Sequence, residues 1–247
     1  MTPSRIDQAA RNNAIWCDTV CRAHDIPGEF RDAVWINRQS VPRFHPNVVT
    51  LSGSGEGARQ RAHIRALMAA GLPGSWGVKD SFKALDLTDL GFHVLFEATW
   101  LWRVPFPTTP HPTPTPTKWT WVRSASELAN WETAWSDDPG NSTSAPPARL
   151  FLPLLLADPR VAFIAAYRDG AIVAGAIANR TGDVVGLSNV FTPCEDRALF
   201  WAGCVTTVQA RFPGLPLVSY QCGPDLAMAQ ALGFERVHDL RVWTRQV

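Results

Sequence analysis

The sequence predicts a mixed α/β fold of the α+β type, in which helices flank a twisted, mostly antiparallel sheet. Strand and helix patterns are interspersed along the chain. Three consecutive strand patterns are joined only by the short turns Asp169-Gly170 and Thr181-Gly182. Such turns are typical of hairpins, so these three strands are expected to be antiparallel. One strand–helix–strand pattern occurs twice in the chain, which predicts two related halves.

A proline-rich segment separates the two halves. Six of the thirteen residues from 105 to 117 are prolines. Proline lacks the N–H group that a sheet ladder needs, and it favours an extended polyproline II path. We therefore expect a spacer here, between an N-terminal half at 1–104 and a C-terminal half at 118–247.

The C-terminal half can be assigned element by element. Residues 118–123 alternate as a strand does, and Ser124 with Glu127 predicts a capping box for a helix that ends near Trp135. Residues 137–147 carry turn chemistry throughout. The elements expected after them are helix 148–157, strands 161–167, 171–179 and 184–191, helix 199–212, strand 217–220, helix 225–232 and strand 236–245.

The N-terminal half contains a second copy of the last of these patterns. Residues 75–103 and 217–245 both predict a strand, a helix, Leu-Gly-Phe, and a strand that ends in Trp and Arg. The glycine precedes the tryptophan by eleven residues in the first copy and by ten in the second. Upstream we expect strands 33–37 and 48–52, and a helix 56–70 that the flexible sequence SGSGEG introduces. This half is expected to be a truncated copy of the other.

Composition excludes several classes of protein. The formal net charge is +1, so no overall field attracts nucleic acid or an anionic membrane. No stretch approaches the roughly 20 apolar residues that span a bilayer, and the first residues lack the apolar core of a secretion signal. The five cysteines lack the spacing of a disulfide framework or of a zinc site. We therefore expect a cytoplasmic protein with no metal, which binds neither nucleic acid nor membrane.

The order of the elements resembles that of the GNAT (general N-acetyltransferase) superfamily. The sequences that carry the resemblance are GAIVAGAIANRTGDVVGLSNVFTP at 170–193 and ALGFERVHDLRVW at 231–243, and it covers essentially all of 118–247. The resemblance implies an enzyme that moves an acyl group from a thioester to an amine. The N-terminal half would then be a degenerate GNAT-like domain in a tandem arrangement.

The resemblance also implies where the thioester donor binds. In the family, a splayed strand contacts the pantetheine arm, and residues 190–193 match the end of that strand. The next turn binds pyrophosphate on the amides of a glycine motif, Q/R-x-x-G-x-G/A, at a helix start. The matching turn, 194–200, has no glycine, and Arg197 is its one side chain suited to an anion. The donor-binding residues expected from this comparison are Val190, Phe191, Thr192, Arg197, Ala198 and Leu199.

Four residues are candidates for catalysis. Ser188 and Asn189 form a polar pair in an apolar strand, where they either face the cleft or belong to a buried network. Asn189 cannot be a base, so it would orient the substrate. Tyr220 is the nearest phenol, since Ala229 stands where many family members place the tyrosine that protonates the leaving thiolate. Glu97 lies in the apolar run VLFEATWLW, where it would either be a base with a raised pKa or face solvent.

The altered turn leaves two functions open. We expect Glu195 or Asp196 to cap the helix, and Phe200 and Trp201 to fill the volume that a nucleotide would otherwise occupy. An enzyme with this turn would use acetyl-CoA or another acyl thioester, or the pantetheine arm of an acyl carrier protein, which presents one phosphodiester. Its acceptor would be a small-molecule amine. The alternative is an inactive GNAT-like binding or interaction module that has lost the phosphate loop.

Overall fold

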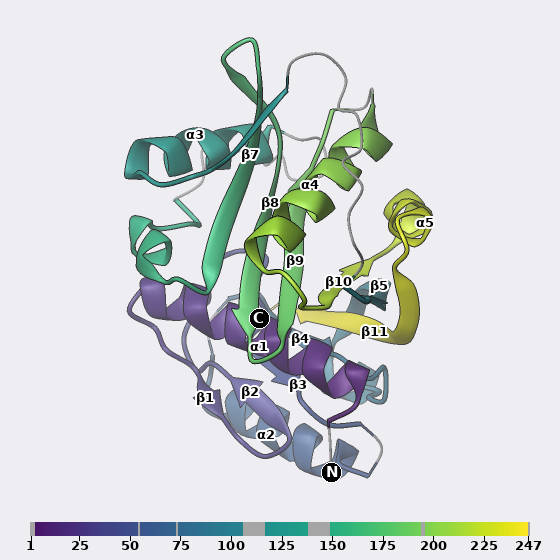
Figure 1. Ribbon diagram of the computed structural model, residues 1–247. Helices are drawn as coiled ribbons and strands as arrows, with labels where there is room; N and C mark the ends of the chain where they lie inside the picture. The colour runs from purple at the N-terminus through teal and green to yellow at the C-terminus, as the bar shows by residue number, and fades with distance from the viewer. Residues whose placement is uncertain are drawn as a thin grey trace. The chain divides into compact units, whose positions relative to one another are not determined.

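Figure 1 shows the computed structural model, which describes residues 3–53, 55–72, 74–105, 117–137, 149–193 and 196–246. The chain divides into two compact units. Unit 1 comprises Met1–Leu101, Tyr220–Cys222 and Arg236–Val247, and unit 2 comprises Trp102–Ser219 and Gly223–Glu235. Most of the expected proline spacer, 105–117, and of the turn-rich segment, 137–147, lies outside the described residues. A boundary between contiguous halves at that spacer therefore stays a prediction.

Unit 2 is built on an antiparallel meander. Its strands are β6 (Lys118–Trp121), β7 (Val161–Arg168), β8 (Ala171–Thr181) and β9 (Val184–Phe191). Each strand pairs antiparallel with the next one in the chain. Gly170 and Gly182 have positive φ, as the short hairpin turns require. β10 (Leu217–Gln221) begins in this unit and runs parallel to β9. The predicted mixed, mostly antiparallel arrangement is confirmed.

Helices cover both faces of this meander. The helices of unit 2 are α3 (Ala125–Ser136), α4 (Arg197–Arg211) and α5 (Gly223–Ala231). Trp131 of α3 lies against Gly175 of β8, where a Cβ atom would come within 2.5 Å of the indole nitrogen. Phe200 of α4 packs on the neighbouring Ala174. Successive strand residues point to opposite faces, so α3 and α4 cover opposite sides of β8; α4 crosses in front of it in Figure 1.

The buried carboxylate of Glu132 fixes the chain that follows α3. It accepts hydrogen bonds from the N–H groups of Leu150 and Phe151 at 2.6 and 3.4 Å. The apolar helix predicted over 148–157 is therefore wrong in its first half, and a short 3₁₀ helix, Pro153–Ala157, takes its place. The residue before a proline avoids the helical region, which explains the late start.

Unit 1 is built on six strands in the order β1-β2-β3-β4-β11-β5. They are β1 (Glu29–Phe30), β2 (Val34–Ile36), β3 (Val48–Thr50), β4 (Trp76–Asp80), β5 (His93–Arg103) and β11 (Glu235–Arg245). β3 and β4 run parallel, whereas β11 pairs antiparallel with the whole of β4. The strands predicted at 33–37 and 48–52 are thus present as β2 and β3.

Two helices complete unit 1, α1 (Arg5–Ala23) and α2 (Gly57–Ala69). Capping boxes begin α1, through Ser4 and Asp7, and α3 of unit 2, through Ser124 and Glu127 as predicted. No helix among the described residues is long and apolar enough to cross a bilayer.

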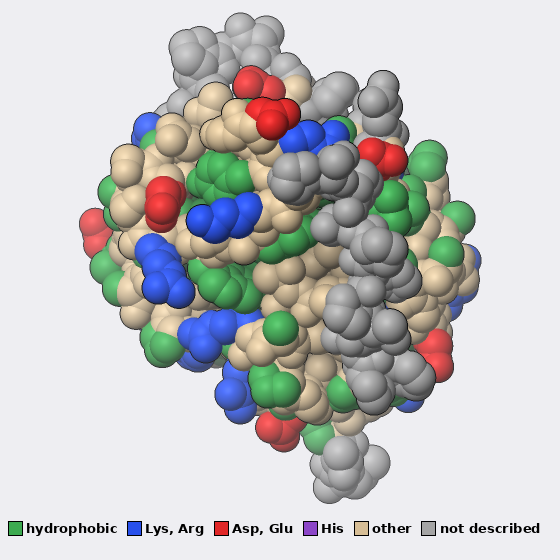
Figure 2. Space-filling view, turned by 45° about the horizontal axis from the view of Figure 1, so that its top comes forward, with side chains coloured by type: hydrophobic (Ala, Val, Ile, Leu, Met, Phe, Trp, Pro, Cys, Tyr) green, Lys and Arg blue, Asp and Glu red, His purple; other side chains and the backbone are tan. Residues whose placement is uncertain are grey.

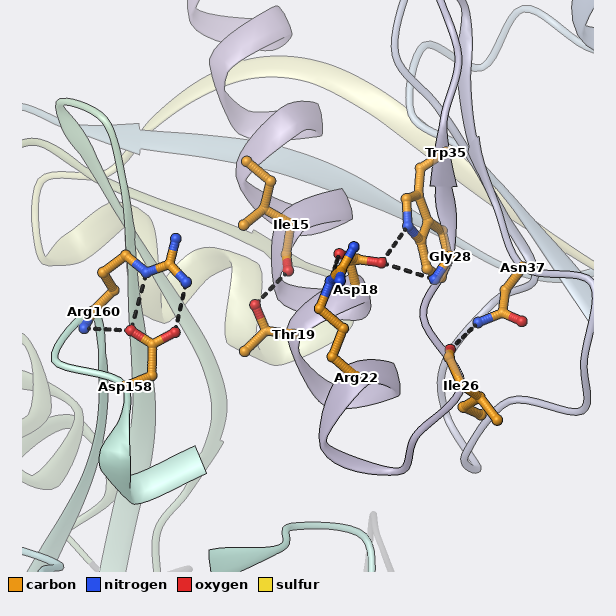
Figure 3. A network of polar contacts seen from close by, with 10 residues as sticks. All are labelled: Ile15, Asp18, Thr19, Arg22, Ile26, Gly28, Trp35, Asn37, Asp158 and Arg160. Carbon is orange, nitrogen blue, oxygen red and sulfur yellow. Dashed lines mark hydrogen bonds and ion pairs between the residues drawn. The ribbon is translucent and has the colours of Figure 1, made fainter. Parts of the chain in front are cut away.

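Asp18 ties α1 to β2 (Figure 3). One carboxylate oxygen accepts hydrogen bonds from the N–H of Gly28 at 2.9 Å and from the indole N–H of Trp35 at 3.1 Å. The other accepts from Nε of Arg22 at 2.5 Å. The indole lies so close to Gly28 that a side chain there would collide with it. These charge-assisted bonds to a buried carboxylate hold the helix against the strand.

The two Leu-Gly-Phe sequences have the same local structure. Gly91 and Gly233 both adopt left-handed backbone conformations, with φ of 77° and 83°. In each case the N–H of the next phenylalanine donates to the carbonyl oxygen five residues earlier. This is the Schellman end of a helix, and a strand of eleven residues follows each one.

The first repeat differs from the second before its glycine. The predicted helix there is wrong: only a 3₁₀ turn, Thr88–Leu90, precedes Gly91, whereas α5 precedes Gly233. The carboxylate of Asp86 accepts hydrogen bonds from the N–H and hydroxyl of Thr88, at 3.0 and 2.6 Å. Such local side-chain bonds compete with helix formation.

The arginines that end the two repeats lie at the glycines. Arg103, at the end of β5, has Nε 3.7 Å from where a Cβ atom of Gly233 would be, and it donates a hydrogen bond to the carbonyl of Leu232 at 2.7 Å. Arg245, at the end of β11, has Nε 3.6 Å from the corresponding position of Gly91. β5 therefore ends beside the glycine that precedes β11, and β11 ends beside the glycine that precedes β5.

We expect Gly233→Ala to lower the free energy of unfolding by about 1–2 kcal/mol, because a Cβ atom disfavours the left-handed conformation by that amount. Gly233→Asn should cost less, since asparagine tolerates this conformation. Gly91→Ala and Gly91→Asn should repeat both results. Urea unfolding followed by tryptophan fluorescence measures the difference, and equal losses for Ala and Asn would contradict a conformational cause.

Candidate active site

Strand β9 leaves regular pairing at Asn189. Phe191 lies opposite Gly175 of β8, whereas Ser188 lies opposite Ile177, so β9 has one residue more than β8 over this stretch. Asn189 has a φ of 52°, in the left-handed region. The extra residue is a β-bulge, which re-aims side chains and increases the local twist. It breaks the strict alternation of faces that the sequence of this strand predicts.

The parallel ladder between β9 and β10 ends before this bulge. It consists of two residue pairs, Val185 with Leu217 and Gly186 with Val218. The last five residues of β9 lie beyond the ladder. The GNAT resemblance implies a splayed strand at this position, and backbone groups beyond the end of a ladder can bind an extended ligand.

The hydroxyl of Ser188 is buried and has no hydrogen-bond partner among the described residues. The expected alternative of a buried polar network is therefore not seen at this side chain. A buried hydroxyl without a partner is uncommon, and it indicates a place where a ligand or water binds.

A cavity of about 580 Å³ lies beside the end of β9 in unit 2. Phe191, Thr192 and Pro193 form one wall. The β7–β8 hairpin and α3 form the others, through Tyr167, Gly170, Ala171, Ile172, Val173, Asn130, Thr133, Ala134 and Asp137. The cavity is mixed in polarity and is large enough for a small-molecule ligand.

Of the two predicted caps of α4, Glu195 or Asp196, the structure describes only Asp196. Asp196 occupies the N-cap position with a φ of 61°, and its side chain makes no capping hydrogen bond. Its carboxylate instead lies 3.9 Å from a terminal nitrogen of Arg168. Glu195, the other expected cap, lies outside the described residues. The expectation that Asp196 caps the helix is wrong, because its left-handed backbone does not present the carboxylate to the first-turn N–H groups.

Side-chain donors surround this helix start. Arg197 binds Asp225 of α5 at 2.6 Å, while its Nε is buried without a hydrogen-bond partner among the described residues. The guanidinium of Arg168 lies 5.1 Å over the ring of Phe200. Its Nε, and the terminal nitrogen that faces Asp196, are also buried without a hydrogen bond to any described residue. The ring of Trp119 lies beside Phe200, and its indole nitrogen is likewise buried without a hydrogen-bond partner among the described residues. Donors without acceptors suit an anion.

Sequence reasoning named Arg197 but missed Arg168. The one signal for Arg168 is its place at the end of a strand, next to the Asp169-Gly170 turn. The expectation that Arg197 is a single free handle is incomplete, because Asp225 already binds it. Phe200 and Trp201 are buried, as expected of residues that fill volume.

Alternating glycines, without the Gln or Arg that begins the family motif, occur at the start of α2 in unit 1. Gly53 and Gly55 lie between β3 and α2, and Gly57 is the first residue of α2. The parallel ladder of β3 with β4 has two residue pairs, like that of β9 with β10. Gly55 has a φ of 96° and open space where a side chain would be. No side chain caps the helix at Glu56. Sequence reasoning treated SGSGEG as flexible, although alternating glycines between a strand and a helix are a phosphate-binding signal.

Tyr220 lies in unit 1, where a buried lysine donates to it. The side chain of Lys79 is almost fully buried, and its Nζ donates to the hydroxyl of Tyr220 at 3.2 Å and to Oδ1 of Asn13 at 3.0 Å. Nζ also stands 4.4 Å from the centre of the tyrosine ring, and Trp100 packs on that ring edge-on. No carboxylate of the described residues pairs with Lys79. A buried ammonium held only by neutral groups is costly and indicates a functional role.

Burial shifts the pKa of two other groups of unit 1 so that both are neutral at pH 7. It raises the pKa of the Cys17 thiol to about 11, although nearby Lys79 partly opposes this. It lowers the pKa of His45 to about 4, with a hydrogen-bond contact between its Nδ1 and the carbonyl of Arg43 acting in the opposite direction. Cys17 is therefore a neutral thiol and His45 a neutral imidazole at pH 7.

Glu97 is not a base with a raised pKa. Hydrogen bonds from Lys83 and Arg241, both at 2.7 Å, hold the pKa of its carboxyl below the usual range. The side chain is exposed on β5, which agrees with the solvent-facing alternative. Asp80 behaves in the opposite way: burial raises its pKa, although its carboxylate accepts a hydrogen bond from the N–H of Leu85 at 2.8 Å.

Figure 2 shows basic and acidic side chains interspersed with apolar ones on one face of the molecule, without a large patch of one sign of charge. Among the described residues, no three histidine, cysteine or acidic side chains gather in a group that could hold a metal ion.

Neither protein-family models nor curated proteins match this sequence. Solved structures do. A GCN5-related N-acetyltransferase from Kribbella flavida matches with a TM-score of 0.61 and 14% identity, over 96% of this chain and 95% of that one. A putative GNAT acetyltransferase from Novosphingobium aromaticivorans matches with a TM-score of 0.57 and 12% identity, over 96% and 99%.

A tandem GNAT protein from the clavulanic acid biosynthesis pathway is similar over a comparable length. Its TM-score is 0.56 at 16% identity, and the match covers 97% of this chain and 95% of that one. The chain therefore has the GNAT fold, as the sequence predicts, and a two-domain member of that fold matches it nearly from end to end. At these identities the likeness establishes the fold.

We expect Lys79→Met to leave the free energy of unfolding unchanged or to raise it by up to about 1 kcal/mol, because it removes a buried charge that has no acidic partner. Lys83→Met, which removes a half-buried lysine paired with Glu97, is the matched control and should change stability by less than about 1 kcal/mol. Thermal unfolding measures both. A loss of several kcal/mol in Lys79→Met alone would show that the ammonium is a structural link between α1 and Tyr220.

Proposed function

We propose that the protein is an acyltransferase, which moves an acyl group from a pantetheine thioester to the amine of a small molecule. The bulge at Asn189, beyond the end of the β9–β10 ladder, is the observation that carries this proposal. In a strand of a GNAT fold, such a break frees backbone N–H and C=O groups. These groups can hydrogen-bond the amides of a pantetheine arm in the way that a sheet edge binds a peptide.

The residues around the bulge fit the steps of acyl transfer. The amine nitrogen attacks the thioester carbonyl and loses a proton, and the C–S bond breaks as the sulfur leaves and takes up a proton. The amide of Asn189 would orient the amine, and the unpartnered hydroxyl of Ser188 would hydrogen-bond the reacting groups. The cavity beside Thr192 and Pro193 would hold the acceptor. Tyr220, which the structure places in unit 1, is the candidate that would protonate the leaving sulfur.

The anionic end of this donor would bind at the start of α4. Arg168 and Arg197, which pair with Asp196 and Asp225, would offer their remaining N–H donors there in place of the glycine amides of the family motif. Arginine reaches further than a backbone N–H and cannot wrap a pyrophosphate as closely. A single phosphodiester, as on the arm of an acyl carrier protein, therefore fits this site better than a nucleotide.

We expect Asn189→Gly to lower kcat by about tenfold to a hundredfold and to leave donor affinity unchanged, because one orienting hydrogen bond is lost. Glycine adopts a φ near 52° freely, so the bulge itself should persist. The measurement is product formation by mass spectrometry with acetyl-CoA and acetyl-pantetheine against a panel of amines. Unchanged turnover in this variant, with an active wild-type protein, would remove Asn189 from the mechanism.

A second function has its own support: binding of coenzyme A at the glycine-rich start of α2. Glycines allow phosphate oxygens to approach backbone N–H groups closely, and the helix dipole favours an anion there. Catalytic inactivity of unit 2 combined with coenzyme A binding in unit 1 would correspond to the alternative of a GNAT-like binding module.

Matched acidic substitutions separate the two helix starts. Gly57→Asp places a carboxylate in the first turn of α2, where a Cβ atom meets only Leu85 at an ordinary 3.7 Å. We expect it to weaken coenzyme A binding by about tenfold or more, since like charges repel, and to leave stability unharmed, since an acid suits a helix start. Ala198→Asp places a carboxylate in the first turn of α4 and should weaken the binding of phosphopantetheine instead.

Calorimetric titration of both variants with coenzyme A and phosphopantetheine measures these effects. If Ala198→Asp abolishes coenzyme A binding while Gly57→Asp leaves it intact, the nucleotide site belongs to α4 and the assignment to α2 is wrong.

A further inference from the structure

Three arginines line a second cavity of unit 2, of about 480 Å³. Arg160 comes directly before β7, Arg180 lies near the end of β8, and Arg211 lies in the last turn of α4. The rest of the lining is Pro159, Gly182 and Phe212. The segments that bring these residues together are far apart in sequence, so the cavity is a product of the fold.

This cavity lies at the end of unit 2 opposite the bulge. β7 and β9 each run eight residues from this end to the other, which is roughly 26 Å at 3.3 Å per residue. α4 runs fifteen residues, or about 22 Å, from Arg197 at its start to Arg211 at its end. The cavity is therefore separate from the proposed active site and from the anion-binding start of α4.

The charges of the cavity are only partly neutralised. Asp158 binds Arg160 through two hydrogen bonds, from Nε at 3.0 Å and from a terminal nitrogen at 2.7 Å (Figure 3). These bonds hold the pKa of Asp158 below its usual range, so the pair is neutral as a whole. The exposed carboxylate of Asp183, in the adjoining turn, forms no ion pair with a described residue.

Two guanidinium groups remain without an acidic partner among the described residues. Arg180 donates from Nε to the carbonyl of Gly182 at 3.0 Å, which fixes the group, and its two terminal nitrogens bind no group of the described residues. Arg211 stands 5.6 Å over the ring of Phe212. Two positioned guanidinium groups beside a neutralised third one match a ligand with two negative charges.

We propose that this cavity binds a small molecule that carries a phosphate group. Guanidinium forks bind phosphate oxygens in pairs, and charge-assisted bonds of this kind are about twice as strong as neutral ones. Pro159 and Phe212 give the cavity an apolar wall, which suits a carbon skeleton attached to the phosphate. This site does not depend on acyl transfer and would bind its ligand in a protein without that activity.

The test is calorimetric titration of the full chain with inorganic phosphate at constant ionic strength. The double variant Arg180→Ala/Arg211→Ala should bind phosphate about tenfold or more weakly than the wild type, because both unpaired charges are lost. Arg123→Ala removes one exposed arginine elsewhere on unit 2 and should bind as the wild type does. Ala198→Asp, which blocks the separate anion site proposed at the start of α4, should leave the phosphate binding that depends on Arg180 and Arg211 intact.

Both arginines of the double variant are exposed, and thermal unfolding is expected to confirm that it folds. Protection of Arg180 from modification by phenylglyoxal in the wild type, read by peptide mass spectrometry with and without phosphate, gives an independent measurement. Equal binding in the double variant, loss of binding in Arg123→Ala, or no protection of Arg180 by phosphate would each overturn the proposal.

Discussion

Unit 1 depends on a strand that the chain supplies about 130 residues after the rest of its sheet. β11 pairs along its last five residues with the whole of β4, from Arg241 opposite Asp80 to Arg245 opposite Trp76. This pairing places Trp243 in the apolar core of the unit. It also brings Arg241 to Glu97. A lone β4 edge would expose unpaired backbone groups and an open core, so the pairing determines whether unit 1 exists as a folded body.

The parts of this fold that the sequence predicts are those set by local chemistry. Hairpin turns at Gly170 and Gly182, the Ser124–Glu127 capping box and the left-handed glycine at 233 each depend on a few neighbouring residues. Where a local bond competes, prediction fails: Asp86 binds Thr88 and leaves a 3₁₀ turn in place of a helix. The membership of β11 in unit 1 also escapes prediction, because pairing partners far apart in sequence leave no periodic signal.

The sequence predicts the strand that carries the candidate site, but it does not predict which residues lie around that strand. Asn189 and Ser188 attract notice as polar residues in an apolar strand, but the bulge that re-aims them is a matter of register against β8. Arg168 and Lys79 become candidates only through their surroundings. Arg168 stacks on Phe200, and Lys79 is buried beside Tyr220. The two helix starts also differ in chemistry. Glycines at the start of α2 allow close approach to fixed backbone N–H groups, whereas Arg168 and Arg197 place guanidinium groups at the start of α4.

Because β11 is synthesised last, the two units also become able to fold at different times during translation. Synthesis at roughly 5–20 residues per second adds the ~130 residues between β5 and β11 in about 7–26 s. All of unit 2 except a few residues emerges in that interval, so it can fold while unit 1 still waits for its missing strand. During this time the β4 edge is a free template for pairing with another chain. β11 closes this edge only after unit 2 has emerged, so the folding of unit 1 follows that of unit 2.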